Sequence, residues 1–235
     1  MISFFDLSKR ELTPFIDSLW YSSQNNVSLY IRGSSLQPME PELGKPIDID
    51  FLLFTYDEIN KIKSIAFDIS SYVNRVFPLI PHLDIKVINC RFKSPELLFN
   101  ALLVKKTGRL LYGDELPYNA VTFMENHNEI ISFTILEAES KLYSVIQTSD
   151  KKIQNKRVPH LSKSILRIAG LLRLKEGIYT RSPQDCTNIL YKKYPNLIKH
   201  VAIIFNGFRY PFLTDELLAS YFIVLNEIKQ DMELE

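Results

Sequence analysis

Hydrophobic and polar positions follow two different periods along the chain, and the balance between them changes near residue 118. Before that point, short apolar or alternating runs, which predict strands, are interleaved with segments in which apolar residues recur every three or four positions, which predict helices. The predicted strands are residues 27–31, 47–54 and 83–89, with a short fourth strand and turn in residues 109–117. The predicted helices are the first 20 residues and residues 56–77 and 96–105, while the proline-rich residues 36–46 predict a loop.

Helical periodicity dominates the rest of the chain. Apolar spacing predicts helices over residues 130–147, 161–176, 182–194, 198–206 and 215–232. The polar and basic residues 147–160 (QTSDKKIQNKRVPH) predict a solvated connector between the first two of these helices. We therefore expect an α+β N-terminal domain over residues 1–118, with a mixed sheet flanked by helices, and an all-α helical-bundle domain over residues 119–235.

The bulk composition narrows the class of protein. Of the 235 residues, 46% are hydrophobic and 23% are charged, which is typical of a globular chain and excludes a largely disordered one. The net charge is +1, so no overall field draws the protein toward nucleic acid. No apolar run approaches the ~20 residues of a membrane span, and Cys90 and Cys186 fit no zinc or redox spacing. We expect a cytoplasmic protein with reduced thiols and no membrane partner.

Two aspartates stand one residue apart in the apolar run of residues 47–54. Residues i and i+2 of a strand project to the same face, so Asp48 and Asp50 are expected side by side. Carboxylates that close repel each other unless they share a cation, and Mg²⁺ prefers hard oxygen ligands of this kind together with substrate phosphates. Asp84, on the next predicted strand, is a candidate third carboxylate, which either completes a second metal position or accepts the proton of an attacking hydroxyl.

A glycine turn follows the first predicted strand. Gly33, Ser34 and Ser35 supply backbone N–H groups and hydroxyls without steric bulk, which suits the phosphates of a nucleotide. Lys86 shares the predicted face of Asp84, so it either pairs with that acid or meets a phosphate.

These features, in this order, resemble the signature of the nucleotidyltransferases of the DNA polymerase beta superfamily. That signature is a hydrophobic residue with Gly-Ser, a spacer, Asp-hydrophobic-Asp-hydrophobic, and a third acid on a later strand. The corresponding segments here are residues 31–34 (IRGS), 48–51 (DIDF) and 83–85 (LDI). The spacer between Ser34 and Asp48 (48 − 34 = 14) is slightly long, and Arg32 stands where the motif usually has an apolar or small residue.

Within that superfamily, the chain looks most like the aminoglycoside adenylyltransferases of the streptomycin and spectinomycin type. Residues 108–113 (GRLLYG) match a segment that precedes their helical C-terminal domain, and a lysine-bearing helix leads to residues 177–182 (GIYTRS). The resemblance implies that the helical domain supplies a lysine to the nucleotide phosphates, here Lys163. It also implies acidic residues for a cationic drug, for which Glu137 and Glu139 are candidates.

The sequence therefore predicts a nucleotidyltransferase that uses Mg²⁺, with two ions expected. It would move a nucleoside monophosphate, AMP by the resemblance, from a nucleoside triphosphate to a hydroxyl of a small molecule such as an aminoglycoside. Two alternatives stay open at this point. The acceptor is a protein or a tRNA, as in toxin–antitoxin systems, or the chain is a non-catalytic nucleotide-binding module.

Overall fold

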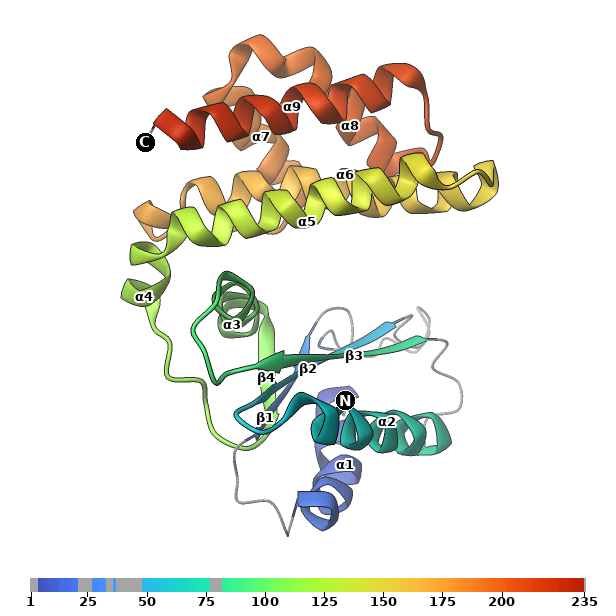
Figure 1. Ribbon diagram of the computed structural model, residues 1–235, viewed down its shortest axis with the longest axis vertical. Coiled ribbons are helices and arrows are strands. Elements are labelled where there is room, and N and C mark those ends of the chain that lie inside the picture. The colour runs from blue at the N-terminus through green and yellow to red at the C-terminus, as the bar shows by residue number, and fades with distance from the viewer. Residues whose placement is uncertain (1–3, 21–26, 33–35, 37–47, 77–81, 235) are drawn as a thin grey trace. The chain divides into compact units, whose positions relative to one another are not determined.

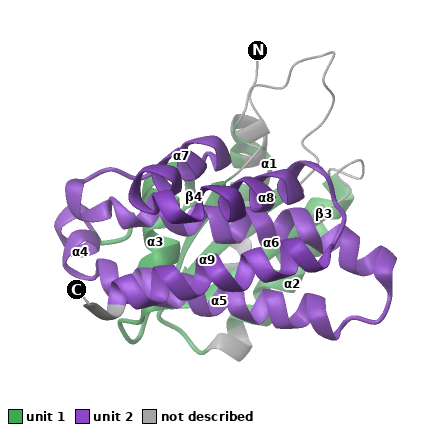
Figure 2. Ribbon diagram, turned by 90° about the horizontal axis from the view of Figure 1, so that it is seen from above, with its two compact units in different colours: residues 1–118 green, residues 119–235 purple. Residues whose placement is uncertain are grey.

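The computed structural model describes residues 4–20, 27–32, 36, 48–76 and 82–234. By its internal contacts the chain divides into two compact units, residues 1–118 and 119–235, coloured green and purple in Figure 2. The boundary falls where the sequence pattern changes from interleaved strands and helices to helices alone. That each unit folds independently as a domain stays a prediction.

A four-stranded mixed sheet forms the centre of the first unit. Its order is β3-β2-β1-β4, with β1 antiparallel to both of its neighbours and β2 parallel to β3. The strands are β1 (Val27–Arg32), β2 (Asp48–Thr55), β3 (His82–Asn89) and β4 (Gly108–Tyr112). The expected α+β class with a mixed sheet is therefore confirmed, and the predicted loop of residues 36–46 lies outside the described residues except for Leu36.

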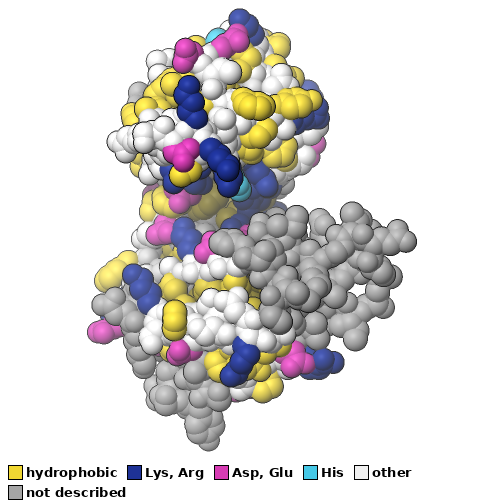
Figure 3. Space-filling model, turned by 90° about the vertical axis from the view of Figure 1, so that its right-hand side faces the viewer, with side chains coloured by type: hydrophobic (Ala, Val, Ile, Leu, Met, Phe, Trp, Pro, Cys, Tyr) yellow, Lys and Arg dark blue, Asp and Glu magenta, His cyan; other side chains and the backbone are white. Residues whose placement is uncertain are grey.

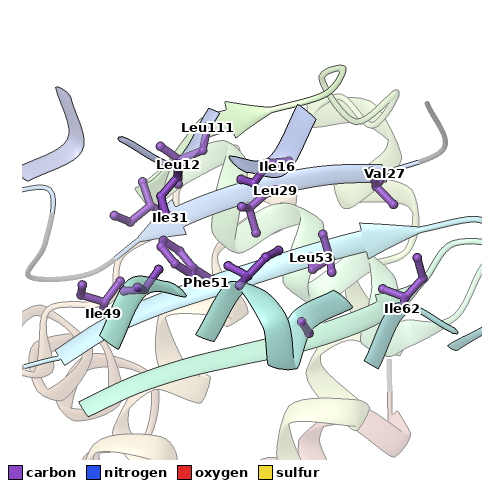
Figure 4. Packing of buried hydrophobic residues seen from close by; sticks show 13 residues of the cluster. Leu12, Ile16, Val27, Leu29, Ile31, Ile49, Phe51, Leu53, Ile62 and Leu111 are labelled. Carbon is purple, nitrogen blue, oxygen red and sulfur yellow. The ribbon is translucent and has the colours of Figure 1, made fainter. Parts of the chain in front are cut away.

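Helices cover both faces of the sheet. Figure 1 shows α1 (Phe4–Trp20) and α2 (Ile59–Val76) on one side and α3 (Pro95–Thr107) on the other. The alternation of β2 explains the division, because Ile49, Phe51 and Leu53 enter the core formed with α1 and α2 (Figure 4). The residues between them project to the α3 side, where Leu52 and Phe54 are buried as well. Strand β2 is thus apolar on both faces after its two acids, Asp48 and Asp50.

The second unit is helical, as expected of the C-terminal region. Its longest helix, α6 (Lys151–Leu172), packs against four others, α5 (His127–Gln147), α7 (Pro183–Lys193), α8 (Ile198–Arg209) and α9 (Asp215–Leu234). A short helix, α4 (Ala120–Glu125), begins the unit, and single 3-10 turns follow at Leu174–Glu176 and Pro195–Leu197. None of the helices in the described part of the chain has both the length and the apolar composition needed to cross a bilayer.

The predicted connector of residues 147–160 is wrong over most of its length, because α6 already begins at Lys151. Asp150 caps the helix by accepting hydrogen bonds from the backbone of Lys152 and Ile153. One buried side chain and one hydrogen bond then hold this polar segment in the bundle. Val158 is buried, and the side-chain oxygen of Asn155 accepts a hydrogen bond of 3.0 Å from the backbone of Leu213.

Candidate active site

The backbone register brings two of the predicted acids to neighbouring positions on one face of the sheet. Asp50 on β2 is the Cα partner of Asp84 on the parallel strand β3 and of Arg32 on the antiparallel strand β1. Residues paired across a sheet project to the same side, and adjacent strands lie about 4.8 Å apart. Asp84, Asp50 and Arg32 therefore form one charged row across three strands, which is called the charged row below.

The other predicted residues of the sheet site are placed only in part. Asp48 begins β2 as the Cα partner of His82, and its backbone position, two residues before Asp50, belongs to the face of the charged row. The side chain of Asp48 lies outside the described residues, and so does the whole glycine turn, Gly33, Ser34 and Ser35. Strand β1 ends at Arg32, directly before that turn.

Arg32 carries a charge that opposes the acids of the row. Its Nη2 lies 3.6 Å from Oδ2 of Asp50, and the two side chains are only 22% and 35% exposed. The sequence pattern marked Arg32 as a departure from the family motif but did not predict this ion pair. A signal was present, because an arginine at the end of the otherwise apolar strand VSLYIR is costly to bury without an anion beside it.

Strand β1 is held in place by the segment that follows β4. The backbone N–H of Leu116 donates a 3.1 Å hydrogen bond to the hydroxyl of Tyr30, and burial raises the pKa of that phenol. The hydroxyl of Ser28 donates to the carbonyl of Asp114. Gly113 makes the intervening turn with a φ of +79°, a conformation that favours glycine. The segment that follows β4 thus holds in place the strand that ends at Arg32.

Helix α3 borders the charged row at both of its ends. Lys86, two residues beyond Asp84, forms a 2.9 Å ion pair with Glu96 in the first turn of α3. At the other end, Gly108 of β4 is the Cα partner of Arg32, and a Cβ on Gly108 would lie 2.9 Å from the Cα of Val104. In the charged row, Arg32 thus lies between Asp50 on one side and a glycine on the other.

Each unit has a surface hollow. One, of about 500 Å³, lies between α2 and the sheet edge formed by residues 84–87, and Lys63, Phe67 and Ser70 line it. Asp84 and Lys86 line it together with Ile85 and Val87, so this hollow reaches the β3 end of the charged row.

The other hollow, of about 650 Å³, lies in the second unit between the end of α6 and α7. Several of its side chains already have partners, since Arg173 pairs with Glu176, Thr180 donates to Asp185, and Lys193 pairs with Asp231. The lining does not include Lys163, the predicted phosphate-binding lysine, which is half-buried on α6. Of the two hollows, the one beside α2 is therefore the one whose lining includes an acid of the charged row, Asp84.

The acids expected to bind a cationic substrate differ in their surroundings. Glu139 accepts from Lys229 at 2.6 Å, so its charge is already balanced by a lysine of α9. Glu137 is half-buried on α5. An internal partner at Glu139 argues against a role for that residue in recognising a polycation.

The chemistry of the charged row suits a hard divalent cation. Asp50 and Asp84 offer carboxylate oxygens from adjacent strands, and Mg²⁺ is typically held by one or two carboxylates plus phosphates and water. Among the residues whose side chains are described, no three His, Cys, Asp or Glu groups gather into a metal cluster. Asp48 would be the third acid by its backbone position.

No protein-family model matches the chain, and no curated protein is similar to it. The geometry of the charged row and the motif order in the sequence are therefore the indications of its function.

Proposed function

We propose that the protein is a magnesium-dependent nucleotidyltransferase. The observation that supports this most is the register, which makes Asp50 and Asp84 Cα partners at the end of the sheet where β1 leads into the glycine turn. Acids that far apart in sequence meet on one face only through this strand pairing. The motif order of Gly-Ser, Asp-x-Asp and a third acid supports the same reaction class.

In this proposal each residue of the chain has a defined task. Asp48 and Asp50 hold Mg²⁺, which neutralises the triphosphate and makes its α-phosphorus open to attack. The amides and hydroxyls of the glycine turn bind the pyrophosphate that leaves. Asp84 either contributes to a second metal position or accepts the proton of the attacking hydroxyl. The residues act by positioning and charge neutralisation, so the order of events needs no covalent intermediate on the protein.

The remaining partners are proposed by resemblance. ATP is the proposed donor, with Lys163 of a C-terminal domain (residues 119–235) contacting its phosphates, and a small-molecule hydroxyl is the proposed acceptor in the cytoplasm. The ion pair of Glu139 with Lys229 weakens the specific case for an aminoglycoside. On the face drawn in Figure 3, cationic side chains lie among hydrophobic and acidic ones, which gives little support to an extended nucleic acid contact there.

The test is a transfer assay with the four nucleoside triphosphates labelled at the α-phosphate, magnesium and cell extract. Release of pyrophosphate reports turnover, and the fraction that carries label separates small-molecule, protein and RNA acceptors. Asp50→Asn and Asp84→Asn should each reduce turnover by at least about 100-fold, because charge neutralisation at the reacting phosphate is lost. Asp68→Asn is the matched control, since Asp68 is an exposed aspartate of α2 and should not affect turnover.

Loss of activity must be separated from loss of structure. The Arg32–Asp50 pair is partly exposed and is worth at most about 1 kcal/mol, so Asp50→Asn should melt within a few degrees of the wild type. Full pyrophosphate release by a folded Asp50→Asn protein in magnesium would refute the assignment.

One observation favours a second candidate, a nucleotide-binding module without turnover. Arg32 already places a cation beside Asp50, so the acid has a counter-ion without a metal. Calorimetry with and without magnesium separates the two functions. Nucleotide binding that is independent of magnesium, together with no pyrophosphate release, would identify the module.

A further inference from the structure

We propose that Arg32 is a phosphate-binding residue that serves as the counter-ion of Asp50 until a metal–nucleotide complex arrives. The inference rests on the proposed function, and it assigns a task to a residue that the family motif leaves without one. In the metal-free protein the guanidinium balances the acids of the charged row. When a divalent cation takes its place at Asp50, Arg32 turns to the phosphates.

The ion pair between Arg32 and Asp50 is close but not tight. Arg32 and Asp50 are Cα partners on antiparallel strands, so their side chains leave the sheet side by side. The 3.6 Å separation of Nη2 and Oδ2 exceeds the roughly 2.7–2.9 Å of a tight charge-assisted hydrogen bond. The pair is therefore close enough to neutralise Asp50 but loose enough to exchange for another ligand.

A metal ion at Asp50 would change the electrostatic surroundings of Arg32. A divalent cation bound by Asp50 would stand within a few ångströms of the guanidinium, and like charges at that distance repel strongly in a partly buried site. Arg32 must then move or gain an anion of its own. A triphosphate held by the same metal ion would be the nearest anion that the reaction supplies, and the planar guanidinium suits bidentate phosphate binding.

The face of the charged row carries a second basic residue besides Arg32. Lys86 also projects from this face, but its Nζ is 2.9 Å from Glu96, which ties it to α3. On the β4 side of Arg32, the cross-strand position in the row is Gly108, which carries no side chain. Of these two basic residues, Arg32 is therefore the one directed at an acid of the proposed metal site.

The experiment compares the wild type with Arg32→Gln, Arg32→Lys and the matched control Arg109→Gln. Arg109 is an exposed arginine of the neighbouring strand β4, one residue out of the charged row. Calorimetric titration uses the α,β-methylene analogues of ATP, GTP, CTP and UTP with magnesium, so that binding is measured without turnover. Arg32→Gln should weaken binding of the preferred analogue by about tenfold or more, because a charged hydrogen bond to phosphate is lost. Arg32→Lys should recover part of that loss, and Arg109→Gln should bind like the wild type.

A second readout tests the metal-free half of the proposal. Without magnesium, Arg32→Gln should lower the melting temperature by about 2–4 °C, and the same change should have a smaller effect in an Asp50→Asn background. An equal effect in both backgrounds would overturn the counter-ion role. If Arg32→Gln does not fold, Arg32→Lys keeps the charge and serves for the titration.

The two proposals fail in different ways. If the wild type binds an analogue and Arg32→Gln binds it equally well, the phosphate role of Arg32 is wrong and the nucleotidyltransferase proposal stands. If the wild type binds none of the four analogues, the proposed function is wrong, and the phosphate role of Arg32 is lost with it.

Discussion

Removing the hydroxyl of Tyr221 should measurably destabilise the helical unit. Tyr221 on α9 and Ser162 on α6 are both 0% exposed, and their oxygens lie 2.6 Å apart. Tyr221→Phe leaves the Ser162 hydroxyl without this partner, and a buried polar group left unsatisfied costs about 1–3 kcal/mol. Because a helical serine can turn to the carbonyl four residues before it, we expect the lower half of that range, or about 1–2 kcal/mol.

Chemical denaturation followed by circular dichroism measures this effect, and Ser162→Ala completes a double-mutant cycle. The cost of the double variant should be smaller than the sum of the single costs, because the two groups share one hydrogen bond. Tyr143→Phe is the control, since Tyr143 is 54% exposed on α5. Equal stability of Tyr221→Phe and the wild type would refute the reasoning, and so would strictly additive single costs.

The same tyrosine gives the unit a pH dependence at the alkaline end. Burial raises the pKa of Tyr221 from 10.0 to about 12 in the folded protein. A group whose folded pKa is raised contributes stability that is complete below its unfolded pKa, so the stabilisation is present below pH 10 and is lost between pH 10 and about 12. Tyr221→Phe should flatten the stability profile in that window. A profile as steep as that of the wild type would contradict the assignment.

Two further predictions follow from the packing. Gly113→Ala should destabilise the first unit by at least about 1 kcal/mol, because its φ of +79° is unfavourable for alanine and a Cβ would lie 2.0 Å from the carbonyl oxygen of Val27; thermal melting measures it, and an unchanged melting temperature would contradict the strain. Cys90 and Cys186 should resist alkylation at pH 8 in the native protein, because burial raises the pKa of each thiol to about 11. Mass spectrometry should find both thiols labelled only after unfolding, and rapid native labelling would show that they are accessible.

The strands of the first unit could be predicted from short apolar runs and, at the start of β2, from an alternation of polarity. Asp48, Ile49, Asp50 and Phe51 alternate in polarity, and the structure buries Ile49 and Phe51 in the α1 and α2 core. The parallel pairing that makes Asp50 and Asp84 partners was not contained in either strand alone. It depends on the intervening helix α2, whose apolar stripe packs on the sheet between them.

The start of α6 could not be predicted because its stabilising contacts are remote in sequence. Apart from Ile153, residues 151–157 are polar and show no apolar face of their own, and Pro159 lies within the helix. The cap by Asp150 is local, but the bond between Asn155 and Leu213 spans 58 positions. Arg32 illustrates the same limit, since only the antiparallel register reveals the acid beside it.

The pairing of β2 with β3 determines where the chain tolerates changes in length. Inserting one residue between Leu83 and Asp84 would rotate every later side chain of β3 to the other side of the sheet. Ile85 would then take the place of Lys86 on the face of the charged row, and Asp84 would be forced among the apolar side chains of α2. Lineages that share this chemistry should therefore vary in length between β1 and β2 or after α2, and keep a fixed count of residues inside β3.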